Sequence, residues 1–480
     1  MRSCFVLCFI FRQCIITGKL TEKQEKLEMR NTMEQNQKKE QNQKEQIDQE
    51  RREARRKRRI RNQAMAYATV LLFLVVVAAG VVFGVNYLTA ESKKKAQENQ
   101  DKLDAMIGTE EALPEPSSEP STEETVAEPT PEQRLDELVS AGIEAMALED
   151  KVAGLFLVTP ESITGVNAAV KAGNGTKDAL AKYSVGGVIY NTRNIQNENQ
   201  LKEMIETTNL YANYPLFIAI EDEGGKVSPL EEKGLVEKVA AGKEYAKQND
   251  SSKAYETGST MGTYLADYGF NLNLAPVADL NSVDHSVMET RAYGDEATMV
   301  IPYVTGMVQG LEEQKVSSCL KHFPGLGATA QSVEEGLASS DRTAEDFRAN
   351  EFQVFQAGID AGADLVMVSH MSVPSLTGDN TPCSMSSAVV TDILRGELGF
   401  DGVVITDAMN LKAVSEYYGA DEGAVLALRA GCDMILMPED FEKAYQGVLE
   451  AVQTGVISED RINDSLKRIY RIKYADRVEE

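Results

Sequence analysis

Histidine is scarce in this chain of 480 residues, which has three copies, His285, His322 and His370. None of them has the spacing to another histidine or to a cysteine that metal-binding motifs show, so we expect no metal centre. A glycine-rich phosphate-binding loop is also missing, which argues against a nucleotide-binding open sheet. These absences point away from metal and nucleotide chemistry.

The six cysteines are too few on either side of a long apolar segment to build a disulfide framework. They fall into two groups of three, namely Cys4, Cys8 and Cys14 before that segment and Cys319, Cys383 and Cys432 after it. An odd number cannot pair completely within one chain. Because Cys319 and Cys432 lie in or beside apolar runs, we expect buried free thiols there.

Positive charge is sparse over most of the chain. The net charge is −26, and residues 1–61 carry 17 basic and 9 acidic residues, or +8, which leaves −34 for the remainder. A nucleic-acid backbone needs a concentrated basic surface to bind to. We therefore expect no nucleic-acid partner for the main domain.

Charged residues are absent from residues 62–90, where valine, leucine and alanine dominate. About 20 such residues cross the hydrocarbon layer of a membrane, and a preceding basic cluster stays in the cytoplasm. The sequence predicts a cytoplasmic tail over residues 1–61 and a single transmembrane helix over residues 62–90. It thereby predicts a location at the cell membrane, with the bulk of the chain outside the cell.

Residues 91–132 are polar and become rich in proline, glutamate, serine and threonine. Such a composition buries too little apolar surface to fold, and the prolines keep the chain extended. We interpret this segment as a disordered stalk. The folded domain is then expected over residues 133–480.

From residue 133 onward, short apolar runs alternate with longer amphipathic segments, the pattern of repeated strand and helix units. Eight runs are candidate strands, at residues 155–158, 188–190, 216–220, 271–274, 316–320, 365–369, 403–406 and 434–437. Eight strands separated by helix-sized gaps predict an α/β fold of the (β/α)₈ TIM-barrel type. A doubly wound open sheet is the competing architecture.

Polar residues gather just beyond the ends of these strands. They are Glu221 to Glu223, Asp279, Lys321 and His322, Ser369 and His370, Asp407, and Glu439 and Asp440. In a barrel enzyme the carboxyl ends of all strands meet at one working face. The pattern therefore predicts that these side chains surround one site.

A carboxylate at a strand end suits a nucleophile that cleaves a sugar linkage, and Asp407 has that position. An equally good interpretation of Asp407 alone is the N-cap of a helix that begins near Asn410. Lys321 and His322 are able to donate hydrogen bonds to sugar hydroxyls, or they form a satisfied structural pair.

Several further motifs carry a family resemblance in their order and spacing. They are residues 146–151, Gly186 to Ile189, Glu223 to Gly225, Asn273 to Asp279, Arg291 to Gly294, Lys321 to Gly325, Gly399 to Gly402 and Thr406 to Met409. With a basic amphipathic helix near residues 461–473, the chain resembles glycoside hydrolase family 3 over roughly 330 residues. Within the family it resembles the compact bacterial β-N-acetylhexosaminidase branch.

The resemblance implies a retaining double displacement with Asp407 as the nucleophile. It also implies that Arg291, Lys321 and His322 hold the hydroxyls of the non-reducing sugar. Glu221 stands where the family usually has an aspartate that binds the same sugar. No cofactor is implied, because activated carboxylates suffice for the reaction.

The loop after Lys321 departs from the branch. Its relatives carry an aspartate, a serine or threonine, and a histidine that acts as acid and base, whereas this chain has Ser332, Val333 and Glu334. Either Glu334 or its neighbour Glu335 is a candidate replacement. The alternatives are an enzyme limited to substrates with good leaving groups, and a silent sugar-binding module.

The sequence thus predicts an enzyme that removes terminal β-linked N-acetylhexosamine from cell-wall-type glycans. A β-glucosidase specificity is the nearest enzymatic rival, and a pseudo-hydrolase that only binds sugar is the alternative from another functional class. The sequence leaves the oligomeric state open.

Overall fold

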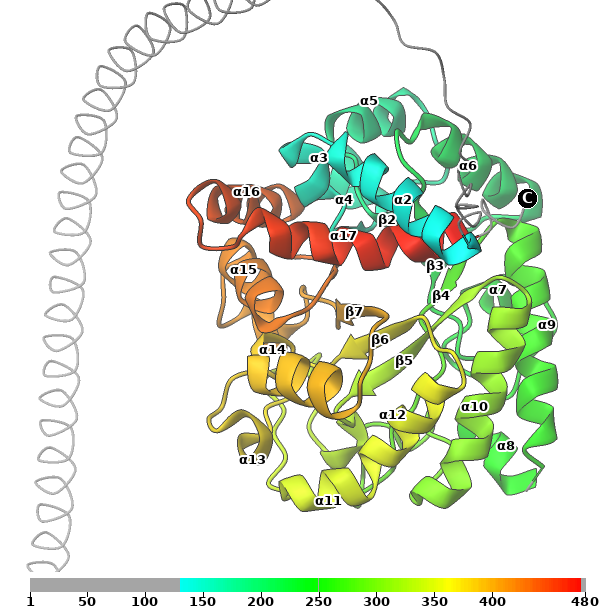
Figure 1. The fold of residues 1–480 in the computed structure, drawn as a ribbon. Coiled ribbons are helices and arrows are strands. Elements are labelled where there is room, and N and C mark those ends of the chain that lie inside the picture. Colours follow the sequence, from blue (N-terminus) through cyan, green and yellow to red (C-terminus); the bar gives the residue numbers. More distant parts are fainter. Residues whose placement is uncertain (1–129, 249, 476–480) are drawn as a thin grey trace, which may run out of the picture. The chain divides into compact units, whose positions relative to one another are not determined.

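Eight short parallel strands form the centre of the folded domain, which the computed structural model describes over residues 130–248 and 250–475 (Figure 1). The strands are β1 (Phe156–Val158), β2 (Gly187–Ile189), β3 (Phe217–Ile220), β4 (Leu272–Asn273), β5 (Ser317–Phe323), β6 (Leu365–Val368), β7 (Val403–Thr406) and β8 (Ile435–Leu436). Each strand pairs with its neighbours in chain order, and β1 also pairs with β8. A parallel bridge between Ile405 and Met434 joins the remaining two ends. The predicted (β/α)₈ barrel is confirmed.

All eight strands are buried along their whole length, and most of them are short and apolar. Such continuous burial is expected where helices cover the outside of a parallel sheet and side chains fill its inside. The strand β5 differs from its prediction, because it runs on to Phe323 and so contains Lys321 and His322. Its register against β6 shifts between Leu320 and Phe323.

Helices surround the strands. The α-helices are α2 (Pro131–Glu144), α3 (Leu148–Ala153), α4 (Pro160–Thr164), α5 (Asn174–Lys182), α6 (Glu198–Tyr211), α7 (Pro229–Glu232), α8 (Gly242–Gln248), α9 (Ser252–Tyr268), α10 (Ala297–Glu313), α11 (Ala344–Ala349), α12 (Glu351–Asp360), α13 (Pro374–Thr377), α14 (Lys412–Ser415), α15 (Ala420–Ala430), α16 (Phe441–Gln453) and α17 (Glu459–Tyr474). Three short 3₁₀ segments are η1 (Thr192–Asn194), η2 (Leu326–Ala328) and η3 (Cys383–Met385), and η4 (Ala388–Glu397) is a π-helix.

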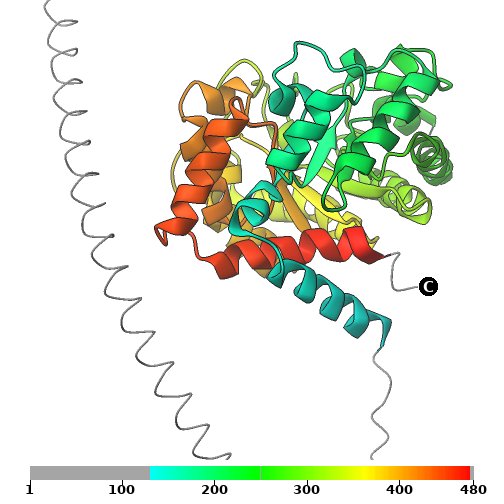
Figure 2. The same cartoon turned by 90° about the horizontal axis from the view of Figure 1, so that it is seen from above.

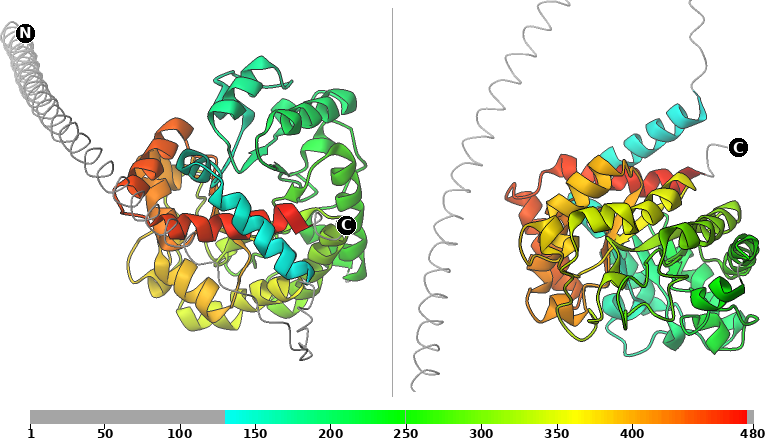
Figure 3. Two further views of the ribbon diagram at one scale, coloured as in Figure 1. Left: turned by 45° about the horizontal axis from the view of Figure 1, so that its top comes forward. Right: turned by 90° about the horizontal axis from the view of Figure 1, so that it is seen from below.

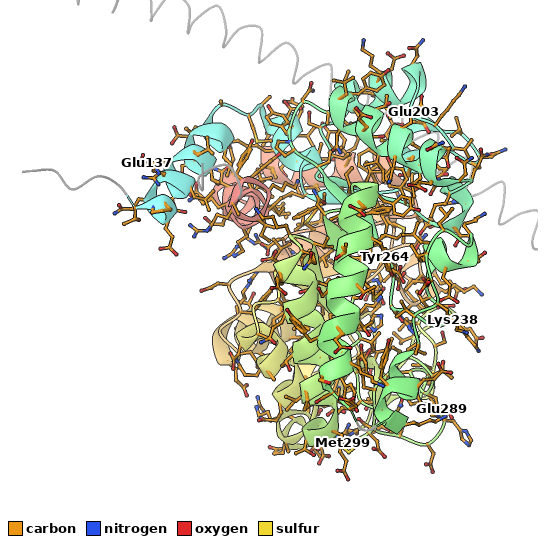
Figure 4. The ribbon with its side chains drawn as sticks, turned by 90° about the vertical axis from the view of Figure 1, so that its right-hand side faces the viewer. Glu137, Glu203, Lys238, Tyr264, Glu289 and Met299 are labelled. Carbon is orange, nitrogen blue, oxygen red and sulfur yellow. The ribbon has the colours of Figure 1, made fainter. Side chains whose placement is uncertain are left out.

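Two of these helices, α9 and α10, lie side by side (Figures 1 and 4). Glycines make the close approach possible, since a Cβ at Gly310 would stand 2.5 Å from the backbone nitrogen of Ser259. A Cβ at Gly258 would likewise stand 2.7 Å from the carbonyl oxygen of Met307. The helix pair therefore forms one tightly packed side of the barrel.

The amino-terminal ends of the strands are covered by α17, which lies beside α2 (Figures 2 and 3). Lys473 of α17 donates a hydrogen bond to the carbonyl oxygen of Gly186, which directly precedes β2. Arg468 of the same helix contacts Asp433, just before β8. The opposite, carboxyl ends of the strands are thus left for the site.

The predicted location at the cell membrane is corrected by the structure. Among the helices of residues 130–248 and 250–475, none is both long and apolar enough to cross a lipid bilayer. The span predicted over residues 62–90 and most of the predicted stalk lie outside the described residues. The three cysteines of the described part, Cys319, Cys383 and Cys432, are buried free thiols.

Asp433 ties the last quarter of the barrel together. Its fully buried carboxylate pairs with Arg395 and accepts hydrogen bonds from the backbone nitrogen of Val404 at 2.9 Å and from Ser465 Oγ at 2.7 Å. Arg468 Nη1 lies 3.3 Å from Asp433 Oδ1, the oxygen that also accepts the hydrogen bond from Ser465. One side chain therefore joins η4, β7 and α17.

We expect Asp433→Asn to lower the free energy of unfolding by about 3 kcal/mol, because removing one partner of a buried ion pair leaves the others uncompensated. Urea denaturation followed by circular dichroism measures the loss. The matched control is Asp464→Asn, whose exposed carboxylate pairs only with Lys467 among the described residues. Equal stability of the two variants would contradict the role given to Asp433.

A second buried acid gives a pH-dependent prediction. Burial, with the neighbouring Asp364 carboxylate, raises the pKa of Glu312 from 4.5 to about 8. The folded protein then keeps a proton that the unfolded chain releases above pH 4.5, so this group lowers stability progressively as pH rises from 4.5 to about 8. We expect Glu312→Gln to gain stability over the wild type across that window, by up to about 1.4 kcal/mol per pH unit. Urea denaturation at pH 5, 6.5 and 8 checks this, and a difference that does not change with pH would refute it.

Candidate active site

A pocket of about 220 Å³ opens at the carboxyl ends of the strands. It is lined by Glu221, Val287, Met288, Arg291, His322, Leu326, Ser332, Val333, Glu334, Asp407, Ala408, Asn410, Leu411 and Met437. Five of the six predicted site residues are in this set. The sixth, Lys321, does not line the pocket, but its ammonium group contacts Glu221. Glu335 is not among the lining residues, and Asp440 instead caps the amino terminus of α16.

Asp407 follows β7 directly and is 7% exposed. Its Oδ1 accepts a hydrogen bond of 2.7 Å from the backbone nitrogen of Ala408, and its own backbone nitrogen donates to the carbonyl oxygen of Val368 at 2.9 Å. The next helix, α14, has Leu411 at its N-cap position, and no side chain caps it. The structure therefore places the Asp407 carboxylate in the pocket, with one oxygen restrained by the backbone.

His370 supports the backbone beside Asp407. Its Nε2 lies 3.1 Å from the carbonyl oxygen of Ala408, and its Nδ1 lies 2.7 Å from Ser384 Oγ. Complete burial lowers the pKa of His370, so the neutral ring donates from Nε2 and accepts from the serine. The sequence placed His370 among the polar residues that follow strands. Its contact with Ala408 could not be predicted, because that contact depends on the fold.

Lys321 has no exposed surface, yet it carries a charge. Its ammonium nitrogen lies 2.6 Å from Glu221 Oε1 and 2.6 Å from Glu223 Oε1. Burial alone would lower the pKa of Lys321, but the two carboxylates outweigh that effect and raise it. The ammonium is therefore held in its charged form, at the wall of the pocket.

Arg291 completes this cluster. Its Nε donates to Glu223 Oε2 at 2.8 Å, its Nη2 contacts the other oxygen of Glu223, and Nη2 lies 3.6 Å from Glu221. Burial would raise the pKa of Glu223, but the charges of Lys321 and Arg291 lower it well below its usual range. The sequence placed Glu223 among the polar residues at the strand ends but assigned it no role. Its spacing of two from Glu221 is a signal, because such residues share one side of an extended segment.

His322 is oriented by Asp279, a fully buried carboxylate. His322 Nδ1 lies 2.7 Å from Asp279 Oδ2, and the same oxygen accepts a hydrogen bond from the backbone nitrogen of His322. Asp279 Oδ1 accepts another from the backbone nitrogen of Leu326. The carboxylate thus accepts a hydrogen bond from Nδ1–H and leaves Nε2 of the ring for other partners.

The loop that carries Glu334 is attached to the barrel through its neighbour. Val333 is 5% exposed, and its carbonyl oxygen accepts a hydrogen bond of 3.1 Å from the backbone nitrogen of Ala413 in α14. The backbone nitrogen of Glu334 donates to Ser332 Oγ at 3.2 Å. Glu334 itself is exposed at the mouth of the pocket. Glu334 and Asp407 therefore border the same pocket.

Comparison with known proteins identifies the family of this chain. The sequence profile described as the glycosyl hydrolase family 3 N terminal domain matches residues 147–472, which is more than half of the chain. The chain belongs to glycosyl hydrolase family 3. The resemblance found in the motifs is thereby confirmed.

Two curated relatives of this family 3 chain are named as hexosaminidases. A beta-hexosaminidase of Xanthomonas axonopodis pv. citri is 32% identical over 279 residues, which are 57% of this chain and 82% of that protein. Beta-hexosaminidase A of Pseudoalteromonas piscicida is 28% identical over 325 residues, which are 62% of this chain and 54% of that protein. The match thus spans about half the length of the Pseudoalteromonas relative. These names support a glycosidase.

Two solved structures share the fold. A glycoside hydrolase family 3 beta-N-acetylglucosaminidase from a Paenibacillus species has a TM-score of 0.64 and 32% identity, over 70% of this chain and 64% of that one. A beta-N-acetylhexosaminidase from Beutenbergia cavernae has a TM-score of 0.60 and 28% identity, over 68% of this chain and 98% of that one.

The backbone at Gly242 is packed tightly against the segment that carries Arg291. A Cβ at Gly242 would stand 2.4 Å from the carbonyl oxygen of Arg291, so Gly242→Ala must displace the arginine segment. We expect about tenfold weaker binding of N-acetylglucosamine, a loss of about 1.4 kcal/mol, measured by titration calorimetry. Gly175→Ala is the control, because a Cβ there meets nothing within 4 Å. Unchanged affinity in Gly242→Ala would show that Arg291 does not bind the sugar.

Proposed function

We propose that this domain hydrolyses terminal, non-reducing β-linked N-acetylhexosamine residues by a retaining double displacement. The observation that carries the proposal is the Asp407 carboxylate, which lines a 220 Å³ pocket together with Glu221, Arg291 and His322. A carboxylate on one side and charged hydrogen-bonding groups on the other suit a sugar held with its anomeric carbon toward Asp407. The names and titles of the family relatives support the same activity.

In the first step, we assign the attack on the anomeric carbon to Asp407 Oδ2, since Oδ1 is occupied by the Ala408 backbone. A bond forms between this oxygen and the carbon, the glycosidic bond breaks, and the leaving oxygen receives a proton from a carboxylic acid. In the second step, water attacks the same carbon, the bond between that carbon and Asp407 Oδ2 breaks, and a proton of the water returns to the carboxylate that acted as the acid. Two inversions then return the sugar with its original β configuration.

Glu334 is the proton donor that we propose. Glu334 is among the residues that line the pocket with Asp407, whereas Glu335 is not. The attachment of Val333 to α14 keeps this part of the loop next to the segment that follows Asp407. A carboxylic acid is a competent replacement for an acid and base histidine, because both exchange a proton with the glycosidic oxygen.

The sugar hydroxyls are assigned to the charged cluster. Arg291 and His322 present donors, and Glu221, which is 38% exposed, presents an acceptor toward the pocket. The buried ammonium of Lys321 holds Glu221 in place, so we assign it to the cluster that supports these groups. Charged hydrogen bonds are the stronger kind and discriminate well between sugar orientations. We propose cell-wall-type glycans that contain N-acetylglucosamine as the source of substrate, and no cofactor is needed for the chemistry.

A silent sugar-binding domain is the second candidate, and the composition of the loop favours it. No histidine occurs between Leu326 and Arg342, so the usual acid and base of the branch is missing. Such a domain would keep the hydroxyl-binding cluster and Asp407 for binding alone.

The deciding experiment compares Asp407→Ala, Glu334→Gln and the control Glu335→Gln on two substrates, a nitrophenyl β-N-acetylglucosaminide and N,N′-diacetylchitobiose. We expect Asp407→Ala to abolish turnover of both, because the nucleophile is lost. Glu334→Gln should lose about 10²-fold on the disaccharide and far less on the nitrophenyl glycoside, whose leaving group needs little protonation. Glu335→Gln should stay within about twofold of the wild type. Initial rates give kcat and KM, and NMR of the first product gives the anomer.

Each proposed role has its own contrary result. Equal losses in the Glu334 and Glu335 variants would remove Glu334 as the acid. An α-anomeric first product would exclude retention. Binding of N-acetylglucosamine without turnover of either substrate by the wild type would establish the silent domain instead.

A further inference from the structure

A second cavity, of about 430 Å³, lies next to the sugar pocket. Its lining includes Glu223, Gly225, Gly242, Glu244 and Arg291, together with four lysines. Figure 4 shows Lys238 and Glu289, labelled, on the side of the domain where the loops before α8 and α10 meet. None of the roles proposed above for catalysis uses this cavity.

The cavity is rich in lysine, although the chain as a whole carries a net charge of −26. Lys226, Lys238, Lys243 and Lys247 all border it, and Lys243 pairs with Glu289 at 2.9 Å. Over the described residues, no carboxylate lies within 4.0 Å of the ammonium groups of the other three. Like charges gathered around one space repel one another, so an anion placed among them is stabilised.

Two carboxylates also border the cavity, and neither neutralises the lysines. Glu223 is already bound to Lys321 and Arg291, with both oxygens occupied. Glu244 is exposed to solvent at the rim. The positive charge of the lysine walls therefore remains available to a ligand.

The walls of the cavity are held in place by backbone contacts. The backbone nitrogen of Gly225 donates a hydrogen bond to the carbonyl oxygen of Val239 at 2.8 Å. Gly225 has a φ of 64°, and a Cβ there would stand 2.5 Å from the Cβ of Ala241. Since Gly242 packs equally closely on Arg291, three chain segments meet with no room for larger side chains. The cavity is thus a built feature of the loops that surround the site.

Arg291 connects the two spaces, because its side chain borders both of them. In the proposed function, Arg291 binds the hydroxyls of the terminal sugar, whereas Asp407 attacks its anomeric carbon. A substituent on the hydroxyl end of the terminal sugar therefore points toward the lysines, whereas the leaving group points away from them.

We propose that the lysine cavity binds an anionic group of the carboxylate or phosphate type next to the terminal sugar. The group comes either from the substrate, as an acidic substituent on the terminal hexosamine, or from a free anion. This inference rests on the proposed function for the position of the sugar, but anion binding itself is testable without turnover.

The test uses the double variant Lys238→Gln/Lys247→Gln and a control with the same charge change, Lys171→Gln/Lys467→Gln, in the full chain. Titration calorimetry with inorganic phosphate measures anion binding directly. We expect phosphate to bind the wild type and the control, and to bind the cavity variant about tenfold more weakly, since each lysine contributes a modest, screened attraction. Raising the salt concentration should weaken the binding.

Kinetics then separate the two sources of the anion. The substrates are a neutral nitrophenyl β-N-acetylglucosaminide and the same compound with a lactyl ether on the sugar. If the anion belongs to the substrate, kcat/KM for the acidic compound falls about tenfold in the cavity variant, and the value for the neutral compound does not change. If phosphate binds but kcat/KM for the acidic compound is the same in the wild type and the cavity variant, the source is a free anion.

Failure of this proposal is distinct from failure of the proposed function. Absence of phosphate binding in the wild type, with equal kinetics for all three proteins on both compounds, would overturn the anion site while leaving the glycosidase intact. Absence of turnover by the wild type, with phosphate binding that the cavity variant loses, would overturn the glycosidase and keep the anion site.

Discussion

An ammonium group without exposed surface must find negative charge within the protein, and Lys321 does so at the top of the barrel. Glu221 and Glu223 compensate it from the loop after β3, and Arg291 compensates Glu223 in turn from the segment before α10. Three separate parts of the chain are therefore held to one another by charge. Side chains that are locked in this way need little rearrangement when a ligand arrives.

The site divides its tasks between rigid and variable elements. Asp407 stands at the end of a buried strand, with its neighbour Ala408 tied to His370, so its position follows from the barrel itself. Glu334 stands on a loop whose backbone is hydrogen-bonded to the rest of the barrel at Thr329, Val333 and Ala338. Loops tolerate substitution better than strands do. This difference allows residue 334 to vary without a change in the strand that positions Asp407.

The barrel was predictable because its strands are buried on both faces and read as separate apolar runs. The interval 403–406 matches β7 at both ends, whereas β5 extends three residues beyond its apolar run. Polar residues are normally excluded from a strand prediction, yet Lys321 and His322 remain in the ladder because buried carboxylates satisfy them. The apolar run at residues 62–90 gave a prediction of the other kind. Hydropathy alone led to a membrane location that the described helices do not support.

By itself, the sequence determined the barrel, the family and which polar residues follow its strands, because apolar periodicity and motif order are local properties of the chain. Only the tertiary structure decided that Glu223, Asp279 and His370 are the partners that orient the site, and that Glu334 rather than Glu335 borders the pocket. Partners such as Glu223 and Arg291 are 68 residues apart along the chain. Their contact, like the cavity of lysines beside it, exists because barrel closure brings distant loops to one end, which no local pattern records.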